Sequence, residues 1–165
     1  KVAVFNKDAY IWAKNCREKF DVVIIDFPDP SNYSLGKLYS LNFYATIQKL
    51  LNQDAVVVIQ TTSPYFAPKS FWCINKTVMQ VFPQIDAYHA YVPSFGEWGF
   101  TIAINGFGTT FNTVNRKVDA LRFYNYQFDK FNYFSQDMIS KDIEINRLDN
   151  QILVRYFDEE WGKLQ

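Results

Sequence analysis

Two spacings of apolar residues recur along the chain, and each predicts a different kind of element. Short runs of consecutive apolar residues, such as 22–25, are typical of strands buried on both faces of a parallel sheet. Apolar residues that recur every three or four positions are typical of helices packed on such a sheet. We therefore expect strands at 1–5, 22–25, 55–59, 84–92 and 99–104, and helices at about 9–20, 40–52, 68–81 and 149–161.

Local signals refine these expectations. Asp8 is a suitable cap for the first helix, and Pro68 favours a helix start. Residues 52–54, Asn-Gln-Asp, indicate a turn before the strand at 55–59. In the helix at 68–81, the residues expected to face the sheet are Phe71, Ile74, Val78 and Met79.

The order of the elements predicts the fold. Strands alternate with helices up to about residue 81, and two strands joined by a hairpin-like loop at 93–98 follow. This order indicates an α/β fold with a mostly parallel, Rossmann-like sheet that is flanked by helices and finished by an antiparallel strand. We expect residues 1–113 to form part of this sheet domain, and 114–165 to form a helical C-terminal extension packed on it. Because a strand-like run begins at the first residue, we also expect the chain to be a fragment that lacks earlier elements.

Two carboxylates follow the apolar run at 22–25. Asp26 ends the predicted strand, and Asp29 lies on the next loop between Pro28 and Pro30. Each proline fixes its own φ angle and restricts the residue before it, so the loop is stiff. In open α/β sheets the ligand crevice lies at the carboxyl ends of the strands, which favours a ligand site here. The simpler alternative is that Asp26 caps a turn and Asp29 is solvated.

Composition excludes several classes of function. Lys and Arg together number 17, as do Asp and Glu, and this balance argues against a general nucleic-acid or membrane-surface role. The chain has no apolar run of transmembrane length and no signal peptide, so we expect a cytoplasmic domain. Cys16 and Cys73 are too scattered to indicate a disulfide framework or a zinc site, and we expect the single histidine, His89, to be structural.

The segments that follow the predicted strands resemble a known family. They are residues 6–9 (NKDA), 26–30 (DFPDP), 60–65 (QTTSPY) and 92–100 (VPSFGEWGF). In this order they are similar to the polyamine aminopropyltransferases, that is, the spermidine synthases. Residues 145–156 (INRLDNQILVRY) resemble a bacterial branch of that family, whose members often carry a membrane-embedded N-terminal region. The resemblance extends over essentially the whole chain and corresponds to the second half of the family's catalytic domain.

The resemblance implies a reaction. An amine nitrogen attacks the aminopropyl carbon beside the sulfonium of decarboxylated S-adenosylmethionine, which serves as a co-substrate without any metal. Putrescine or a related amine becomes spermidine, and methylthioadenosine leaves. An alkyl amine has a pKa of about 10.4 in water and arrives protonated, so a carboxylate is needed to orient it and take its proton.

The resemblance also implies roles for individual residues. Asp26 would take the proton from the attacking nitrogen. The residues implied to bind the amine are Asp29, Gln60, Phe95 and Tyr33. Those implied to bind the nucleoside co-substrate are Asp8, Ala9 and Leu35. Tyr33, Leu35 and Tyr39 would lie on a loop that covers the site, and the alternative is that they are ordinary loop and core side chains.

Two departures from the family pattern leave other functions open. The chain lacks the glycine-rich nucleotide loop with its acidic residue, and Phe95 stands where many spermidine synthases have a tyrosine. One alternative is an S-adenosylmethionine-dependent N-methyltransferase. Such enzymes have an Asp/Asn-Pro-Pro-aromatic loop, whereas the segment 26–29 (DFPD) has only one proline and a second acid in place of the aromatic residue. The other is a non-catalytic domain. For an aminopropyltransferase the expected partners are small-molecule amine and sulfonium substrates and further copies of the chain, without nucleic acid or membrane contact by this domain.

Overall fold

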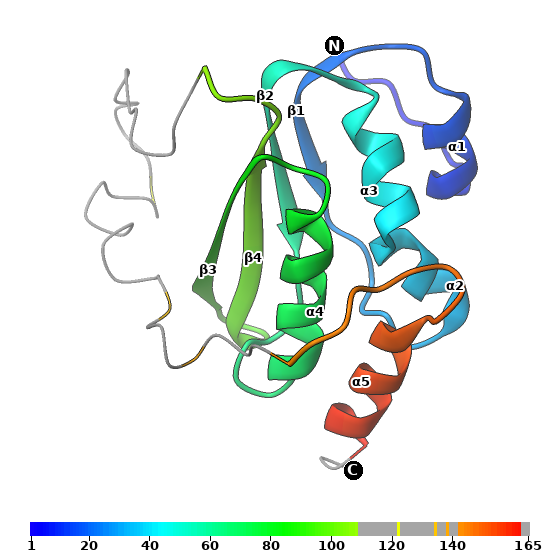
Figure 1. The fold of residues 1–165 in the computed structure, drawn as a ribbon. Helices are drawn as coiled ribbons and strands as arrows, with labels where there is room; N and C mark the ends of the chain where they lie inside the picture. The colour runs from blue at the N-terminus through cyan, green and yellow to red at the C-terminus, as the bar shows by residue number, and fades with distance from the viewer. Residues whose placement is uncertain (109–121, 123–133, 135–137, 139–141, 163–165) are drawn as a thin grey trace.

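A four-stranded sheet with helices packed on one face forms the body of the molecule in the computed structural model (Figure 1). The structure describes residues 1–108, 122, 134, 138 and 142–162. In chain order the elements are α1 (Ala9–Asn15), β1 (Phe20–Ile25), α2 (Tyr33–Gly36), the 3-10 helix η1 (Lys37–Tyr39), α3 (Leu41–Gln48), β2 (Leu51–Gln60), α4 (Pro68–Met79), β3 (Gln84–Val92), β4 (Gly96–Ile104) and α5 (Ile152–Trp161).

The strand order of the sheet is β1-β2-β4-β3. β1 and β2 are parallel, with Ile25 opposite Ile59, whereas β4 pairs antiparallel with both β2 and β3. The predicted α/β fold with an antiparallel finish is confirmed. The sheet is mixed rather than mostly parallel, because β4 inserts between β2 and β3 as part of the hairpin.

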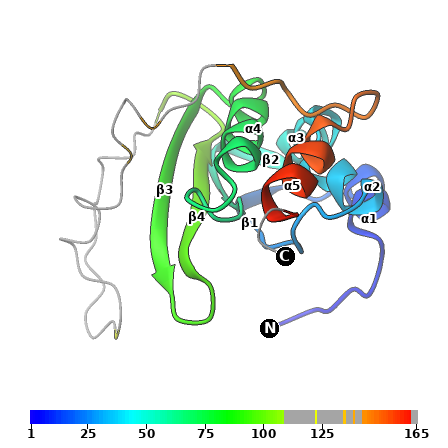
Figure 2. The same cartoon turned by 90° about the horizontal axis from the view of Figure 1, so that it is seen from below.

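The two faces of the sheet have different surroundings. On the face toward the helices, Val57, Ile59 and Ala103 are fully buried. On the other face, Val22 and Ile24 of β1 are 61% and 74% exposed. Figure 2 shows α3, α4 and α5 together on one side of the sheet. The prediction that 22–25 is buried on both faces is therefore wrong for this chain, because the described residues supply helices for one face only.

The segment Lys1–Phe5 is not a strand, in contrast to the sequence expectation. Val2 and Val4 are 92% and 87% exposed, and none of the four strands pairs with this segment. A strand needs a neighbour for its backbone N–H and C=O groups. Within the described residues this segment has no such neighbour.

The observed bounds of two elements, α1 and β2, differ from the predicted ones. α1 ends at Asn15 instead of about 20, because β1 already begins at Phe20. β2 begins at Leu51, so the predicted turn at 52–54 lies inside the strand. Its turn-like residues are accommodated by an irregular start: Asp54 has a φ of 59°, and the β1–β2 register shifts between Phe20 and Val22.

The α4 helix packs on the sheet largely as predicted. Phe71, Ile74 and Val78 are fully buried, which confirms that part of its expected apolar face. Met79, expected on the same face, is 57% exposed because it is the last residue of the helix. α5 confirms the last predicted helix and packs on α4 and α2.

Much of the predicted helical extension at 114–165 lies outside the described residues. The proposed division of the chain into 1–113 and 114–165 falls there and stays a prediction. Within the part of the chain that is described, every helix is too short or too polar to cross a membrane.

Candidate functional site

The carboxyl ends of β1 and β2 bring the first predicted site residues together. Because the two strands are parallel and Ile25 lies opposite Ile59, Asp26, which follows β1, lies beside Gln60, the last residue of β2. Asp26 is exposed and Asp29 is half-buried. Gln60 Nε2 donates a hydrogen bond of 3.2 Å to Asp29 Oδ1. This hydrogen bond connects the loop after β1 to the end of β2.

A buried tyrosine, Tyr39, forms hydrogen bonds to the backbone of this loop. The Tyr39 hydroxyl lies 3.1 Å and 3.0 Å from the carbonyl oxygens of Phe27 and Pro28, and 3.3 Å from Gln60 Oε1. The side chain has no exposed surface, and burial, with Asp29 and Asp26 nearby, raises the pKa of its hydroxyl, which therefore stays a donor. Tyr39 and Asp29 together orient the Gln60 amide, with its oxygen toward the tyrosine and its nitrogen toward the carboxylate.

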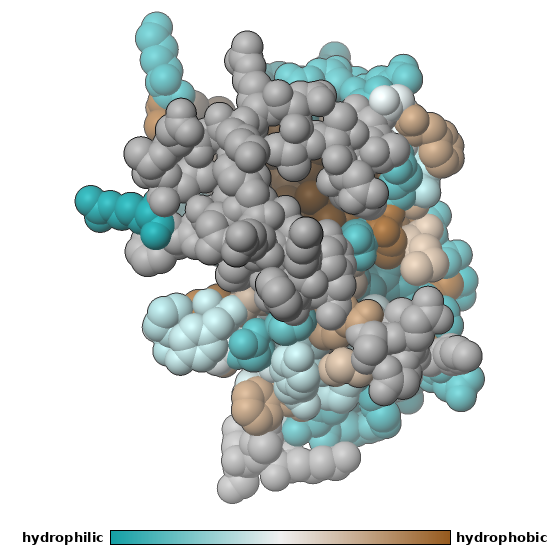
Figure 3. Space-filling model, turned by 90° about the vertical axis from the view of Figure 1, so that its left-hand side faces the viewer, coloured by the Kyte–Doolittle hydropathy of each residue, from teal (hydrophilic) through white to brown (hydrophobic). Residues whose placement is uncertain are grey.

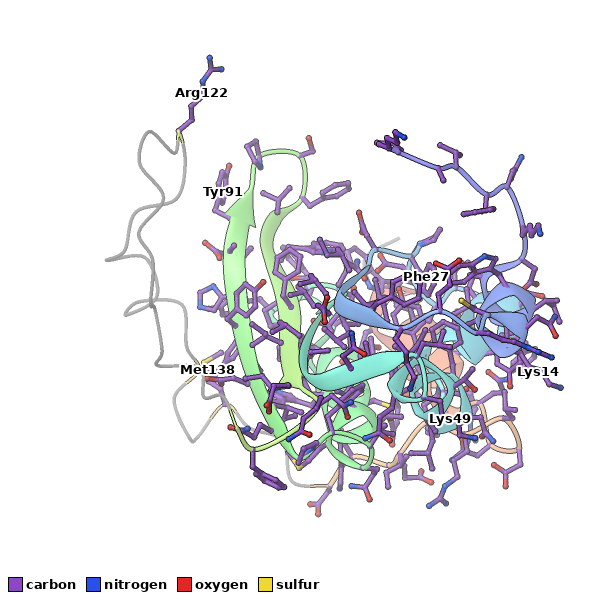
Figure 4. The ribbon with its side chains drawn as sticks, turned by 90° about the horizontal axis from the view of Figure 1, so that it is seen from above. Lys14, Phe27, Lys49, Tyr91, Arg122 and Met138 are labelled. Carbon is purple, nitrogen blue, oxygen red and sulfur yellow. The ribbon has the colours of Figure 1, made fainter. Side chains whose placement is uncertain are left out.

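The strand ends and the β3–β4 hairpin enclose a pocket of about 630 Å³, which we call the acceptor pocket. The polar residues that line it are Asp26, Asp29 and Gln60, and the other lining residues are apolar or aromatic. Figure 4 labels Phe27 in the loop after β1 and Tyr91 near the end of β3, the two chain segments between which the pocket lies. The apolar lining includes Ile24, Val58, Val92, Phe95, Trp98 and Phe100.

Asp29 is the more buried of the two acids, and its surroundings alter its acidity. Burial raises the pKa of the Asp29 carboxyl, and the hydrogen bond from Gln60 opposes that rise. A cationic ligand in the pocket would favour the ionised form in the same way as Gln60 does. The arrangement therefore suits an ammonium group as ligand, since apolar walls desolvate it and two carboxylates offset its charge.

The hairpin that closes the pocket depends on two glycines. Gly96 has a φ of 77°, in the left-handed region that favours glycine. Gly99 lies so close to α4 that an added Cβ would be 2.4 Å from the Phe71 ring and 2.7 Å from the Thr62 carbonyl oxygen. Thr62 itself is fully buried with a φ of 66°, a costly conformation for a β-branched residue, so the surrounding structure holds this loop tightly.

Asp8 does not line the acceptor pocket. It caps α1, where its carboxylate accepts hydrogen bonds from the N–H groups of Tyr10 and Ile11, and it forms a 2.9 Å ion pair with Lys37. The hydrogen bond from Lys37 is the main reason that the pKa of Asp8 is lowered. Asp8 lines a separate hollow of about 480 Å³ with Lys7 and residues of α1.

The remaining predicted site residues divide between the pocket and its surroundings. Phe95 lines the acceptor pocket, with its ring 5.1 Å from that of Trp98. Tyr33 is 64% exposed on α2, and neither it nor Leu35 lines a described pocket; Ala9 is the first residue of α1. The structure thus places Asp26, Asp29, Gln60 and Phe95 in one pocket and Asp8 in another.

Two further residues near the pocket were only weakly indicated by the sequence. Tyr39 was expected on a loop that covers the site, with an ordinary loop or core side chain as the alternative; it is fully buried and contacts the loop after β1. Trp98 belongs to the 92–100 motif but was not singled out, although it is buried near the turn of the hairpin, opposite Ala90. His89, expected to be structural, pairs with Glu97 at 2.8 Å and lines none of the described pockets. The described residues hold no cluster of three side chains suited to a metal ion.

The topology and the pocket define an α/β protein with a pocket at the carboxyl edge of its sheet, the place where open α/β sheets have their ligand crevice. Comparison with known protein families identifies the family to which the chain belongs. Residues 1–117 match the family described as "Spermine/spermidine synthase domain". The chain therefore belongs to the spermine/spermidine synthase family.

Curated relatives are similar over nearly the whole chain. The polyamine aminopropyltransferase of Leptospira interrogans is 46% identical over 168 residues, which cover 99% of this chain and 32% of that protein. Polyamine aminopropyltransferase 2 of Ralstonia nicotianae is 46% identical over 98% of this chain and 32% of its own length. The chain thus spans about a third of the length of these relatives.

Solved structures of spermidine synthases share the fold. One, in complex with the transition state analogue AdoDATO, has a TM-score of 0.55 and 20% identity over 95% of this chain and 50% of that chain. The spermidine synthase from Thermotoga maritima has a TM-score of 0.52 and 18% identity, over 93% of this chain and 47% of that chain. At this level of identity the likeness concerns the fold alone.

Proposed function

We propose that the protein to which this chain belongs transfers an aminopropyl group from decarboxylated S-adenosylmethionine to putrescine or a related amine. The observation that carries the proposal is the acceptor pocket, in which two carboxylates and an oriented amide meet apolar and aromatic walls. The names of the curated relatives, all polyamine aminopropyltransferases, support it. The activity concerns the whole protein, of which this chain supplies the acceptor side.

In the proposed reaction, the lone pair of the amine nitrogen attacks the aminopropyl carbon bonded to sulfur. A C–N bond forms as the C–S bond breaks, and the bonding pair moves to the sulfonium, which leaves as a neutral thioether. Before the attack, the Asp26 carboxylate, acting as general base, takes a proton from the protonated amine and so makes this lone pair available; the product nitrogen is left as a secondary ammonium. Asp29, held by Gln60, binds the ammonium group at the other end of the amine.

Other family expectations stay predictions. Binding of the nucleoside part by Asp8, Ala9 and Leu35 is one, since none of these residues lines the acceptor pocket. A contribution from Tyr33 to amine binding is another. A cytoplasmic location and a homo-oligomeric assembly are two more.

A product assay tests the proposal. The full-length protein is incubated with putrescine and either decarboxylated or ordinary S-adenosylmethionine, and the products are identified by mass spectrometry. We expect spermidine and methylthioadenosine with the decarboxylated co-substrate only. Methylated putrescine with ordinary S-adenosylmethionine would instead indicate an N-methyltransferase, and no product with either would contradict both activities.

A further inference from the structure

Thr62, in the loop after β2, combines two unfavourable features. Its φ angle is 66°, in the left-handed region that β-branched residues rarely adopt. The residue is fully buried, and its hydroxyl has no hydrogen-bond partner within the part of the chain that the structure describes. Strained residues cluster at functional sites, and a buried hydroxyl without a partner destabilises a folded protein. Neither feature is therefore explained by the stability of the loop.

Hydrogen bonds on either side hold Thr62 in this conformation. Its carbonyl oxygen accepts from the N–H of Gly99 at 2.9 Å, and the N–H of Thr61 donates to the Gly99 carbonyl oxygen at 3.0 Å. The next residue, Ser63, donates from its hydroxyl to the Glu97 carbonyl oxygen at 3.0 Å. The loop is thus attached to β4 at three consecutive residues, and this attachment keeps the Thr62 side chain in place.

The Thr62 side chain lies beside Asp29. Burial raises the pKa of the Asp29 carboxyl, and the hydrogen-bonding groups of Gln60 and Thr62 oppose that rise. Gln60 does so through its hydrogen bond of 3.2 Å, whereas the Thr62 hydroxyl lies nearby without forming one. Hydrogen bonds of active sites are often long in the free protein and shorten when the substrate binds. Because Thr62 lines none of the described pockets, a ligand in the acceptor pocket meets Asp29 and not Thr62.

We propose that Thr62 is a positioning residue for Asp29, and that its hydroxyl donates a hydrogen bond to the ionised carboxylate when an amine occupies the acceptor pocket. The inference rests on the proposed aminopropyl transfer and adds a residue to its amine-binding side. An ammonium group at Asp29 favours the ionised carboxylate, which accepts stronger hydrogen bonds than a neutral acid does. In the complex, Gln60 and Thr62 hold the carboxylate from two donors, and the buried hydroxyl gains the partner that it lacks in the free protein.

Steady-state kinetics of the full-length enzyme, with putrescine and saturating decarboxylated S-adenosylmethionine, test this role. Thr62→Val keeps the size and the β-branch of the side chain but removes the hydroxyl. A hydrogen bond to a charged group corresponds to a factor of roughly 10 to 150 in binding, so the KM for putrescine should rise by about tenfold or more. The kcat should stay nearly unchanged, as for a loss of uniform binding. Thr62→Ser keeps the hydroxyl and should retain a KM close to that of the unmodified enzyme.

The pH profile of the KM is a second readout, which a purely structural role would not change. Without the Thr62 donor the pKa of Asp29 should be higher, so on acidification Thr62→Val should lose putrescine binding at a higher pH than the unmodified enzyme. The titratable groups that face Asp29 are Asp26 in the same pocket and the Tyr39 hydroxyl of η1. The strands, the hairpin and α5 present only neutral side chains to the pockets that Asp29 lines. The substitution leaves all these groups in place.

Thr61→Val is the matched control. Thr61 is equally buried, and its hydroxyl also lacks a hydrogen-bond partner among the described residues, but it is not one of the groups that act on Asp29. This variant should change neither the KM nor its pH profile.

An unchanged KM in folded Thr62→Val, or the same rise in Thr61→Val, would overturn the proposed role of Thr62 and leave aminopropyl transfer standing. If Thr62→Val did not fold, Thr62→Gly would decide in its place, because glycine adopts a φ of 66° without strain and also lacks the hydroxyl. A full-length enzyme that transfers to no amine would contradict the proposed function and this role with it.

Discussion

At the scale of single residues, the acceptor pocket depends on the hydroxyl of Tyr39, a residue that does not itself line the pocket. Tyr39→Phe removes the donor shared by the carbonyl oxygens of the loop and by Gln60 Oε1. Unpaired buried acceptors cost about 1–3 kcal/mol, so we expect urea unfolding to show a loss of that size and the KM for the amine to rise. Tyr44→Phe is the control, since the buried Tyr44 hydroxyl has no hydrogen-bond partner among the described residues and its removal should be close to neutral.

Asp29 gives a second prediction at this scale, through its altered acidity. Burial raises the pKa of this carboxyl in the folded protein, so its contribution to stability is fully present below its unfolded pKa of about 3.9 and is lost as the pH rises through the folded pKa. Asp29→Asn removes that loss. The gain in thermal stability from the substitution should therefore be larger at about pH 7 than at about pH 3.

The same substitution should raise the KM for the amine, since it removes the proposed counter-charge. Asp158→Asn, at an exposed position of α5, serves as the control and should show no such change in stability or in KM. A larger stability gain for Asp29→Asn at low pH than at neutral pH would contradict the assignment of a buried, ionisable Asp29.

At the scale of elements, a single buried residue, Asn146, connects four helical segments through its side chain and its backbone. The Asn146 side chain donates to the Gly36 carbonyl oxygen at 3.0 Å and accepts from the Leu153 N–H at 3.3 Å. Its backbone N–H donates to the Thr77 hydroxyl, and its carbonyl accepts from the Leu41 N–H. The loop before α5 is thereby attached to α2, α3 and α4.

Asn146→Ala would leave two buried backbone groups without partners. We expect the free energy of unfolding to fall by roughly 2–4 kcal/mol, measured by urea denaturation. Asn42→Ala, on the exposed face of α3, is the control and should change stability by less than about 0.5 kcal/mol. Equal effects of the two substitutions would show that the Asn146 network does not hold these helices together.

The sequence predicted elements well where their apolar residues pack against other parts of the same chain. α4 and the β3–β4 pair are examples, because their inward residues pack on one another. It failed where tertiary pairing overrode local signals, as at residues 52–54, which have turn residues but lie in β2. It also failed at Lys1–Phe5 and on the outer face of β1, where strand-like sequence has no partner within the described residues.

For the candidate site, the linear motifs were enough to bring Asp26, Asp29, Gln60 and Phe95 to one pocket. Because β1 and β2 are parallel, both strands end at the same edge of the sheet, and the residues at their carboxyl ends therefore lie close together. The support that Tyr39 gives to the loop after β1 could not be predicted in the same way. It depends on contacts with Phe27, Pro28 and Gln60, which are distant in the chain, and an aromatic residue in a helix has the same local sequence pattern whether it packs in the core or supports a pocket.

At the scale of the whole molecule, the sheet has an apolar face and a strand edge at β1 that the described residues leave uncovered. Figure 3, viewed from the side of β3, shows hydrophilic and hydrophobic residues next to one another among those that are not grey. Open apolar strand edges favour pairing with another chain. We therefore expect the 165-residue chain by itself to self-associate through β1.

Light scattering across a concentration series checks this expectation. Ile24→Lys should raise the monomer fraction, because it places a charge on the exposed apolar face of β1. Met79→Lys, which alters an apolar residue of similar exposure at the end of α4, should not. A monomer at high concentration for the unmodified chain would contradict the prediction.

The central claim is that Asp26 is the base in an aminopropyl transfer, and one kinetic comparison tests it most directly. In the full-length enzyme, Asp26→Asn preserves the shape and most hydrogen bonding of the side chain but removes its basicity. We predict that kcat for spermidine formation from putrescine falls by roughly 10²–10⁴-fold at neutral pH and partly recovers at high pH, where more amine is unprotonated. Near-normal turnover by an Asp26→Asn protein that folds as well as the parent, judged by circular dichroism, would contradict the assignment.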